Sequence, residues 1–338
     1  MEMKKEREAS NIYQIEKGSR VGIICCSDGR RMEGFGLDSA AESDPELFAL
    51  LQKLEAMGLR PTLSPCIYAG EGGTAGSGRQ RAEALMDFYR DDSIRAIFDI
   101  SGGNAANEVL PFLDFSVIAA TDKLFWGYSD LTVILNAIHA RTGKCSVLWQ
   151  VRNLLYENGK EQEQALRAAL FGERERNGKG EGPKKQEPLF SFPVRFLQKE
   201  RMEGIVAGGN LRCLLKLAGT PFWPDLRGRI LLLEALGGGE ALIASGLSQL
   251  YQMGVFSQIS GLLLGTFTEL ERKAPDERMR LAALIREYAG QELPIAETPR
   301  VGHGADSAAV LIGGRLLLED SLTSSGSFPS PRQSQNDI

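Results

Sequence analysis

The chain has 338 residues, 43% of them hydrophobic and 25% charged, and a formal net charge of −5 at neutral pH. A single hydrophobic core rarely supports a chain of this length, so we expect two domains. The excess of acidic residues argues against a nucleic-acid partner. The polar N-terminal stretch lacks the apolar centre of a signal peptide, and no run reaches the roughly 18 apolar residues of a membrane span. The five cysteines form no C-x-x-C pair. We therefore expect free thiols in a cytoplasmic protein that contacts no membrane.

The first 156 residues alternate strand-like and helix-like segments. Strands are expected at 20–25, 60–64, 95–100 and 124–126, and helices at 45–57, at 79–89, from about 104 and from 130 to about 141. This alternation predicts an α/β fold with a Rossmann-like parallel sheet in the N-terminal domain, residues 1–156. Ligands of such sheets bind at the carboxyl ends of the strands, where Gly102-Gly103 and Ser129 would lie.

The composition changes after residue 156. Residues 157–200 include a charged, Gly- and Pro-rich run and are interpreted as a linker with an exposed loop. Apolar runs at 229–233 and 261–265 then indicate a smaller, strand-rich C-terminal domain, 201–324. Gly313-Gly314, between the runs 308–312 and 315–319, predicts a two-residue hairpin. The polar residues 325–338 predict a disordered tail.

Ser129 stands where the strand 124–126 turns into a helix. A serine on such a bend is exposed, its oxygen faces the positive end of the helix dipole, and the N–H of Asp130 offers an oxyanion donor. The sequence G-Y-S-D does not match the G-x-S-x-G pattern. Ser129 could equally serve only as the helix cap, which is a common use of serine.

Only two histidines are available as a catalytic base, His139 and His303. His139 follows Ser129 by ten positions on one helix, which is about 15 Å along the axis and too far for contact, so it is interpreted as a core-edge residue. His303 lies in a glycine-flanked loop, where the backbone can approach a ligand closely. A plain surface position remains the alternative for His303.

Glu234 interrupts the apolar run 230–233. A carboxylate in such a strand is costly unless it has a cationic partner, and an imidazole that becomes charged during catalysis would be one. The alternative is a strand-end glutamate facing solvent. The glycine-rich stretches 70–78 and 208–210 match neither the P-loop nor the dinucleotide fingerprint.

Together these segments resemble the LD-carboxypeptidase family of serine peptidases, including its microcin C immunity branch. The resemblance covers residues 17–320. The motifs occur in family order: IFDISGGN at 97–104, LPFLD at 110–114, GYSD at 127–130, AGGNL at 207–211, AGTP at 218–221, ILLLE at 230–234 and GHG at 302–304. Ser-Gly-Gly at 101–103, in place of the Arg-Gly-Gly usual in the carboxypeptidases, is closer to the immunity branch.

The resemblance implies a catalytic triad whose members lie in both domains: Ser129 as nucleophile, His303 as base and Glu234 as its orienting acid. It also implies an oxyanion hole from the amides of Asp130 and Gly103. The candidate substrate-binding residues are Asn104, Arg152 and Asn210, with Arg152 a candidate for a terminal carboxylate. No metal or other cofactor is expected, and family members often form homodimers.

Three functions remain open at this level. The first is an L,D-carboxypeptidase that releases a terminal D-amino acid from cell-wall muropeptides during peptidoglycan recycling. The second is an immunity-type amidase that cleaves peptidyl- or aminoacyl-nucleotides. The third, from another class, is a non-catalytic peptide-binding module, which would be expected to have lost a member of the triad, although all three residue types are present in order.

Overall fold

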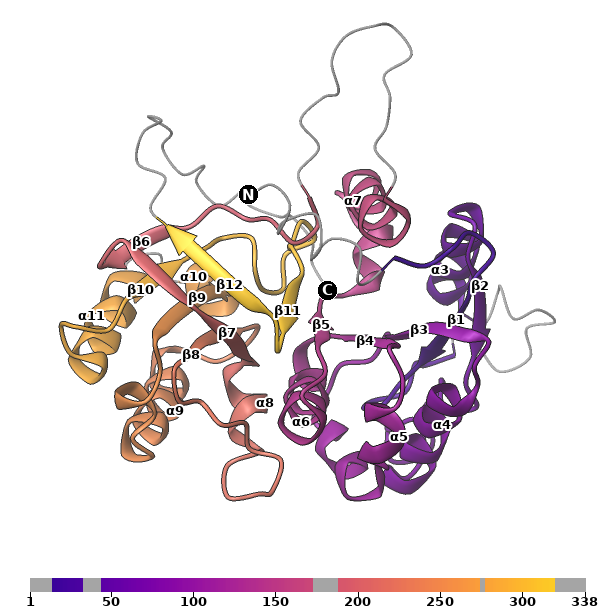
Figure 1. Cartoon of the computed structure of the whole chain (residues 1–338), viewed down its shortest axis with the longest axis horizontal. Helices are drawn as coiled ribbons and strands as arrows, with labels where there is room; N and C mark the ends of the chain where they lie inside the picture. The colour runs from indigo at the N-terminus through magenta and orange to yellow at the C-terminus, as the bar shows by residue number, and fades with distance from the viewer. Residues whose placement is uncertain (1–13, 33–43, 173–187, 274–276, 320–338) are drawn as a thin grey trace, which may run out of the picture.

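Two six-stranded sheets organise the part of the chain that the computed structural model describes, residues 14–32, 44–172, 188–273 and 277–319. Figure 1 shows one sheet and its helices in the N-terminal half and the other in the C-terminal half. The first sheet has the order β11-β5-β4-β3-β1-β2, and the second has the order β12-β7-β8-β9-β10-β6. The predicted α/β fold with a Rossmann-like N-terminal sheet is confirmed.

The first sheet is parallel from β2 to β5, and β11 joins its edge antiparallel to β5. Its strands are β1 (Arg20–Ile24), β2 (Arg60–Leu63), β3 (Ile94–Asp99), β4 (Leu124–Gly127), β5 (Ser146–Leu148) and β11 (Val310–Ile312). The connecting segments contain α3 (Pro45–Ala56), α4 (Gly78–Arg90), η1 (Ala106–Phe112), α5 (Phe115–Ala119), η2 (Ser129–Leu131) and α6 (Thr132–Thr142).

The second sheet is parallel from β7 to β10, with antiparallel strands at both edges. Its strands are β6 (Arg195–Gln198), β7 (Arg201–Asn210), β8 (Arg229–Ala235), β9 (Gly261–Phe267), β10 (Ile295–Glu297) and β12 (Arg315–Glu319). The helices of this half are α8 (Leu211–Leu215), α9 (Glu240–Gln252), η4 (Val255–Ser257), α10 (Thr268–Lys273) and α11 (Glu277–Ala289). No helix within the described ranges is long and apolar enough to cross a membrane.

Local sequence explains why these elements begin where they do. The Asp44 carboxylate accepts a hydrogen bond from the Leu47 amide at 3.0 Å and caps α3, while Ser77 and Gln80 form a capping box at the start of α4. The six residues of β8 after Arg229 are all buried, as expected for a central parallel strand covered on both faces.

Two predictions about the C-terminal half are wrong. Residues 157–200 are not one linker, because they contain the helix α7 (Gly159–Phe171) and the strand β6; α7 forms because its Ala165, Leu166 and Leu170 bury one face. The predicted hairpin at Gly313-Gly314 does not form either, since β11 pairs with β5 and β12 pairs with β7. The glycine pair instead carries the chain from one sheet to the other, where larger pairing surfaces are available to both strands.

Other predicted segments lie outside the described residues. These are the tail 325–338 and the greater part of the charged loop, 173–187. Nothing in the structure bears on either prediction.

Helix α6 packs against the C-terminal half of the chain (Figure 1), and its buried Asn136 bonds to that half. Asn136 donates to the carbonyl of Gly208 at 2.9 Å and accepts from the amide of the same residue at 2.8 Å. The Asn136 side chain therefore pairs with both the N–H and the carbonyl of Gly208 in β7. Gly208 lies beyond Ile205, where the pairing of β12 with β7 ends. This contact links the element that follows β4 to the strand that leads into α8.

We expect Asn136→Ala to lower the free energy of unfolding by about 2–4 kcal/mol, because it leaves two buried backbone groups of Gly208 without a partner. Urea unfolding followed by circular dichroism measures this change. Asn107→Ala serves as the matched control, since Asn107 is exposed and its removal should cost less than about 0.5 kcal/mol. Equal losses in the two variants would contradict the structural role of Asn136.

Candidate active site

Ser129 occupies the bend between β4 and α6. Its φ of 53° lies in the left-handed region that residues other than glycine rarely adopt, and the side chain is half-buried. No side-chain hydrogen bond caps η2 or α6, so the alternative that Ser129 only caps the helix is wrong. A strained left-handed serine between a strand and a helix is the geometry in which a hydroxyl is presented to substrate.

The two amides predicted as oxyanion donors lie at the carboxyl edge of the first sheet. The N–H of Asp130 is in the first turn of η2, where amides have no partner within the helix. Gly103 has a φ of 122°, and a Cβ at this position would overlap the Asp28 carboxylate, so only glycine fits. The amide of Asp28 donates to the Gly102 carbonyl at 3.0 Å. That bond fixes the peptide plane that also contains the Gly103 N–H.

Glu234 is fully buried near the end of β8. Its Oε2 lies 2.7 Å from Nδ1 of His303, and its Oε1 accepts a hydrogen bond from Nδ2 of Asn210 at 3.0 Å. The alternative of a solvent-facing glutamate is therefore wrong. A buried carboxylate on Nδ1 holds the imidazole in one orientation and stabilises its protonated form.

His303 lies between Glu234 and the turn that contains Ser129. Its side chain is only 7% exposed, so the surface alternative is wrong. The imidazole ring lies 4.3 Å, centroid to centroid, from the ring of Tyr128, the neighbour of Ser129. Its Nε2 is buried and has no hydrogen-bond partner among the described residues. A general base has to accept a hydrogen bond from the group that it deprotonates. In a protein without bound substrate that hydrogen bond is often long or not yet formed.

A second path of contacts leads from Glu234 back to the nucleophile turn. Asn210, whose side chain bonds Glu234, is the N-cap of α8. Its backbone N–H donates to the hydroxyl of Thr132 at 3.0 Å. Thr132 is three residues from Ser129 and is the first residue of α6. The contacts thus close a ring that joins both sheets, and the ring includes all three predicted catalytic residues or their direct neighbours.

The remaining predicted site residues have definite positions. Asn104 is exposed beside Gly103, and its Oδ1 accepts from Arg212. Arg152 follows β5 and donates from Nε to Glu46 at 2.8 Å. Asn210 is buried. Its side-chain amide donates to Glu234 and accepts from the backbone N–H of Cys213, which caps α8. Substrate binding by these residues stays a prediction.

His139 lies apart from this site. Its Nδ1 is 3.3 Å from the carbonyl oxygen of Lys144, and the ring packs against Gly313 at the crossing between the sheets. Burial lowers the pKa of His139, and the nearby Arg229 lowers it further. The prediction that His139 is a core-edge residue is confirmed.

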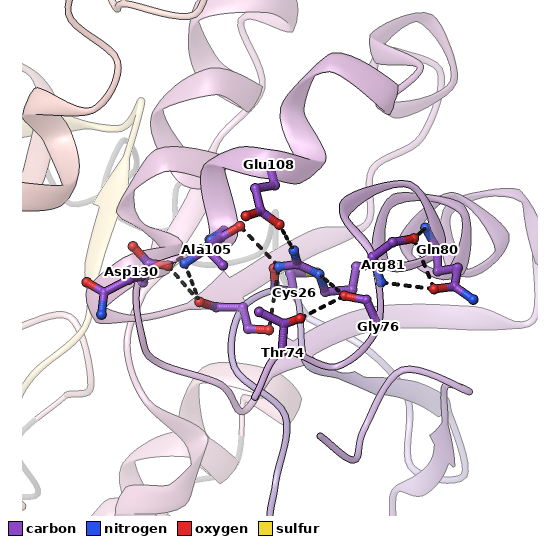
Figure 2. A network of polar contacts seen from close by, with 12 residues as sticks. Cys26, Thr74, Gly76, Gln80, Arg81, Ala105, Glu108 and Asp130 are labelled. Carbon is purple, nitrogen blue, oxygen red and sulfur yellow. Dashed lines mark hydrogen bonds and ion pairs between the residues drawn. The ribbon is translucent and has the colours of Figure 1, made fainter. Parts of the chain in front are cut away.

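Buried polar side chains form hydrogen bonds with the loops next to the site (Figure 2). Arg81 of α4 is fully buried and donates to the carbonyls of Cys26, Gly76 and Ala105, as well as to Glu108. Asp99, at the end of β3, accepts from the Cys26 amide at 2.8 Å and from the amide and hydroxyl of Ser101. These two side chains fix the loops that follow β1 and β3.

Sequence reasoning did not identify Arg212 and Lys216. Both contact the loop at 103–104, and Lys216 also pairs with Asp130. Their spacing of four on and after α8 puts them on one helix face, but the same spacing also describes an ordinary solvated face. Within the described residues, no three side chains of the metal-binding types lie together as a metal site would require.

Comparison with known proteins finds matches to both halves of the chain. Residues 21–148 match the model of the LD-carboxypeptidase N-terminal domain, and residues 203–318 match that of its C-terminal domain. The murein tetrapeptide carboxypeptidase of Pseudomonas aeruginosa is 30% identical over 81% of this chain and 88% of its own. The chain belongs to the LD-carboxypeptidase family. The resemblance seen in the motifs is thereby confirmed, and the protein is a serine hydrolase.

Two further members of the LD-carboxypeptidase family are similar along most of the chain. The probable murein peptide carboxypeptidase of Bacillus subtilis is 28% identical over 90% of each chain. The solved structure of the microcin C7 self-immunity protein MccF, from Escherichia coli, in complex with aspartyl sulfamoyl adenosine superposes with a TM-score of 0.75. The superposition covers 90% of this chain and 94% of that one at 20% identity, which supports the common fold.

We expect Ser129→Gly to be more stable than Ser129→Ala by about 1 kcal/mol. Both variants lack the hydroxyl, but only glycine adopts the left-handed φ of this position without strain. Thermal and urea unfolding of the two purified variants measure the difference. If Ser129→Ala were the more stable of the two, the strain assigned to the turn would be absent.

The buried Asp99 should make the free energy of unfolding depend on pH. Burial raises its pKa to about 6, although hydrogen bonds from Ser101 and Cys26 partly oppose the shift. Between about pH 4 and pH 6 the folded chain therefore keeps a proton that the unfolded chain has lost, so this group makes stability fall as pH rises through that window and adds nothing further above it.

The corresponding measurement is urea unfolding of the wild type and Asp99→Asn at several pH values. The stability difference between them should move in favour of the variant by up to about 3 kcal/mol from pH 4 to pH 7. Asp122→Asn, which removes a carboxylate that is 97% exposed, is the control. Parallel pH profiles for the wild type and Asp99→Asn would contradict the prediction.

Proposed function

We propose that this protein hydrolyses an amide bond in a small peptide, with Ser129 as nucleophile, His303 as general base and Glu234 as the group that orients the imidazole. The observation that carries the proposal is the buried pair of Glu234 and His303, whose imidazole packs against Tyr128, the residue that precedes the strained Ser129. An imidazole with a carboxylate on Nδ1 is suited to accept a proton from a serine hydroxyl at its other nitrogen.

The reaction follows from these positions. The Ser129 oxygen attacks the substrate carbonyl while its proton passes to Nε2 of His303. The oxyanion accepts hydrogen bonds from the amides of Asp130 and Gly103. The imidazolium, stabilised by Glu234, donates its proton to the leaving amine as the C–N bond breaks. Water then attacks the acyl-enzyme and gives a proton to the same nitrogen. As the ester bond breaks, the imidazolium returns that proton to the Ser129 oxygen, and the carboxylic acid product is released.

For the substrate, we propose a muropeptide with an L,D-linked terminal amino acid. The name of the Pseudomonas aeruginosa relative, which meets this chain at 30% identity, supports this choice. Arg152 supports it as well, because its side chain is 28% exposed and only its Nε is paired with a described residue. The two remaining guanidinium nitrogens suit a terminal carboxylate.

A cytoplasmic role in peptidoglycan recycling, carried out by a homodimer, forms part of the proposal. None of the five cysteines, all within the described residues, forms a disulfide, which supports a reducing compartment. The second candidate is an amidase acting on aminoacyl- or peptidyl-nucleotides, favoured by Ser101 in front of the double glycine and by the fold shared with the immunity protein.

The test is mass spectrometry of the protein incubated with a muropeptide tetrapeptide and, separately, with an aminoacyl-sulfamoyl adenosine. We expect release of D-alanine from the tetrapeptide, and a loss of at least about 10⁴-fold in kcat for Ser129→Ala. Ser257→Ala removes an exposed hydroxyl of η4 and should leave the rate unchanged.

Other outcomes discriminate among the candidates. Cleavage of the nucleotide conjugate alone would assign the protein to the amidase function. Binding of either compound without turnover would favour the non-catalytic module, and full activity of Ser129→Ala would remove the serine from the mechanism.

A further inference from the structure

The short helix α8 contacts the catalytic groups of both sheets. Its N-cap, Asn210, holds Glu234 on the second sheet. Arg212 and Lys216, one helical turn apart, reach across to the first sheet. Figure 1 shows α8 next to α6 of the N-terminal half. The same turn of chain therefore touches the acid of the proposed triad and the loop that carries the proposed oxyanion donor.

Lys216 is paired with a fully buried carboxylate. Its Nζ donates to Oδ1 of Asp130 and also, at 2.8 Å, to the carbonyl of Asn104. The other oxygen of Asp130 accepts from the Ser27 hydroxyl at 2.7 Å and from the Ala106 amide at 2.8 Å. Burial disfavours a charge on Asp130, but the bonds from Lys216, Ala106 and Ser27 outweigh it and hold the pKa of this carboxyl below its ordinary value.

Arg212 contacts the same loop one residue earlier. One guanidinium nitrogen donates to Oδ1 of Asn104, and another donates to the Gly103 carbonyl at 3.2 Å. Three consecutive carbonyls, those of Gly102, Gly103 and Asn104, are thus each held by a donor: the Asp28 amide, Arg212 and Lys216. Since each carbonyl shares a rigid plane with the next N–H, the three bonds set the directions of the loop amides.

We infer that Lys216 and Arg212 are positioning residues of the reaction, which hold the Gly103–Asn104 loop against the Asp130 turn so that both oxyanion donors face one point. The inference rests on the proposed function for its catalytic consequence. The peptide plane that contains the Gly103 N–H is held by Asp28 of the N-terminal half. The two planes that follow it are held by Arg212 and Lys216 of the C-terminal half, so the whole loop is held only when α8 is docked on the first sheet.

An ordinary ion pair would not have this arrangement. An exposed lysine pair contributes little to stability and can be removed with little effect. Lys216 instead keeps a fully buried carboxylate ionised and holds a backbone carbonyl of the loop with the same ammonium group. A misplaced oxyanion donor affects the transition state more than substrate binding, because the charge on the oxygen develops only during reaction.

The test compares Lys216→Met, Lys216→Arg and Arg212→Met with the control Lys144→Met, whose lysine pairs with Asp122 on the surface. We expect kcat to fall roughly 10- to 100-fold in Lys216→Met while KM changes less than about threefold, because losing one oxyanion donor outright costs about 10²–10³. Lys216→Arg should recover a substantial part of kcat, because an arginine keeps the charge and can donate to both acceptors. Lys144→Met should match the wild type.

Arg212→Met keeps the inference testable if Lys216→Met fails to fold. Arg212 is exposed, so its removal leaves no buried charge, and thermal melting should show a native fold. We expect a kcat loss of about 3- to 30-fold in this variant, again with little change in KM. A wild-type kcat in both folded variants, or a loss confined to KM, would overturn the inference.

Hydrogen–deuterium exchange of the resting protein provides a measurement that needs no substrate. We expect the amides of 102–107 to exchange roughly tenfold faster in Arg212→Met and Lys216→Met, and at the wild-type rate in Lys144→Met. Unchanged exchange in both variants would overturn the inference even in an active enzyme. A wild type that cleaves neither substrate would count against the proposed function, while the exchange result would still decide whether the two cations hold the loop.

Discussion

The structure of the site depends on one buried carboxylate. Glu234 is fully enclosed near the end of an apolar strand, and an unpaired charge there would cost several kcal/mol. Its two oxygens are paired with His303 and Asn210. Satisfying this single charge therefore fixes an imidazole from the loop after β10 and the last residue of β7, and the rest of the site is arranged around them.

The contacts that join the two halves of the chain are also the contacts that shape the site. Thr132 bonds Asn210, Asn136 bonds Gly208, and Lys216 bonds Asp130, each across the boundary between the sheets. The crossing of the chain from β11 to β12 adds a covalent connection to these bonds. Because Ser129 belongs to one half and His303 to the other, docking of the halves and assembly of the candidate site are one process.

The local elements were predictable because they depend on short-range pattern. Alternating apolar runs and caps predicted β1 to β4 and α3, α4 and α6 to within a few residues. The pattern failed where the outcome depended on distant partners. The apolar face of α7 was hidden in a charged, glycine-rich neighbourhood, and the strands around Gly313 had the signature of a hairpin. Those strands pair with β5 and β7 instead, because edges of two existing sheets were available to them.

The sequence by itself determined the fold class and, through its ordered motifs, the family. The resemblance to that family then supplied Ser129, Glu234 and His303 as the candidate site residues. Only the tertiary structure decided that Glu234 and His303 form a buried pair, that Ser129 is left-handed, and that Arg212 and Lys216 face the oxyanion loop. The reason is physical: burial and pairing of a charge depend on segments more than 60 residues apart in the chain, and a local pattern of residues contains no information about which distant segment will cover it.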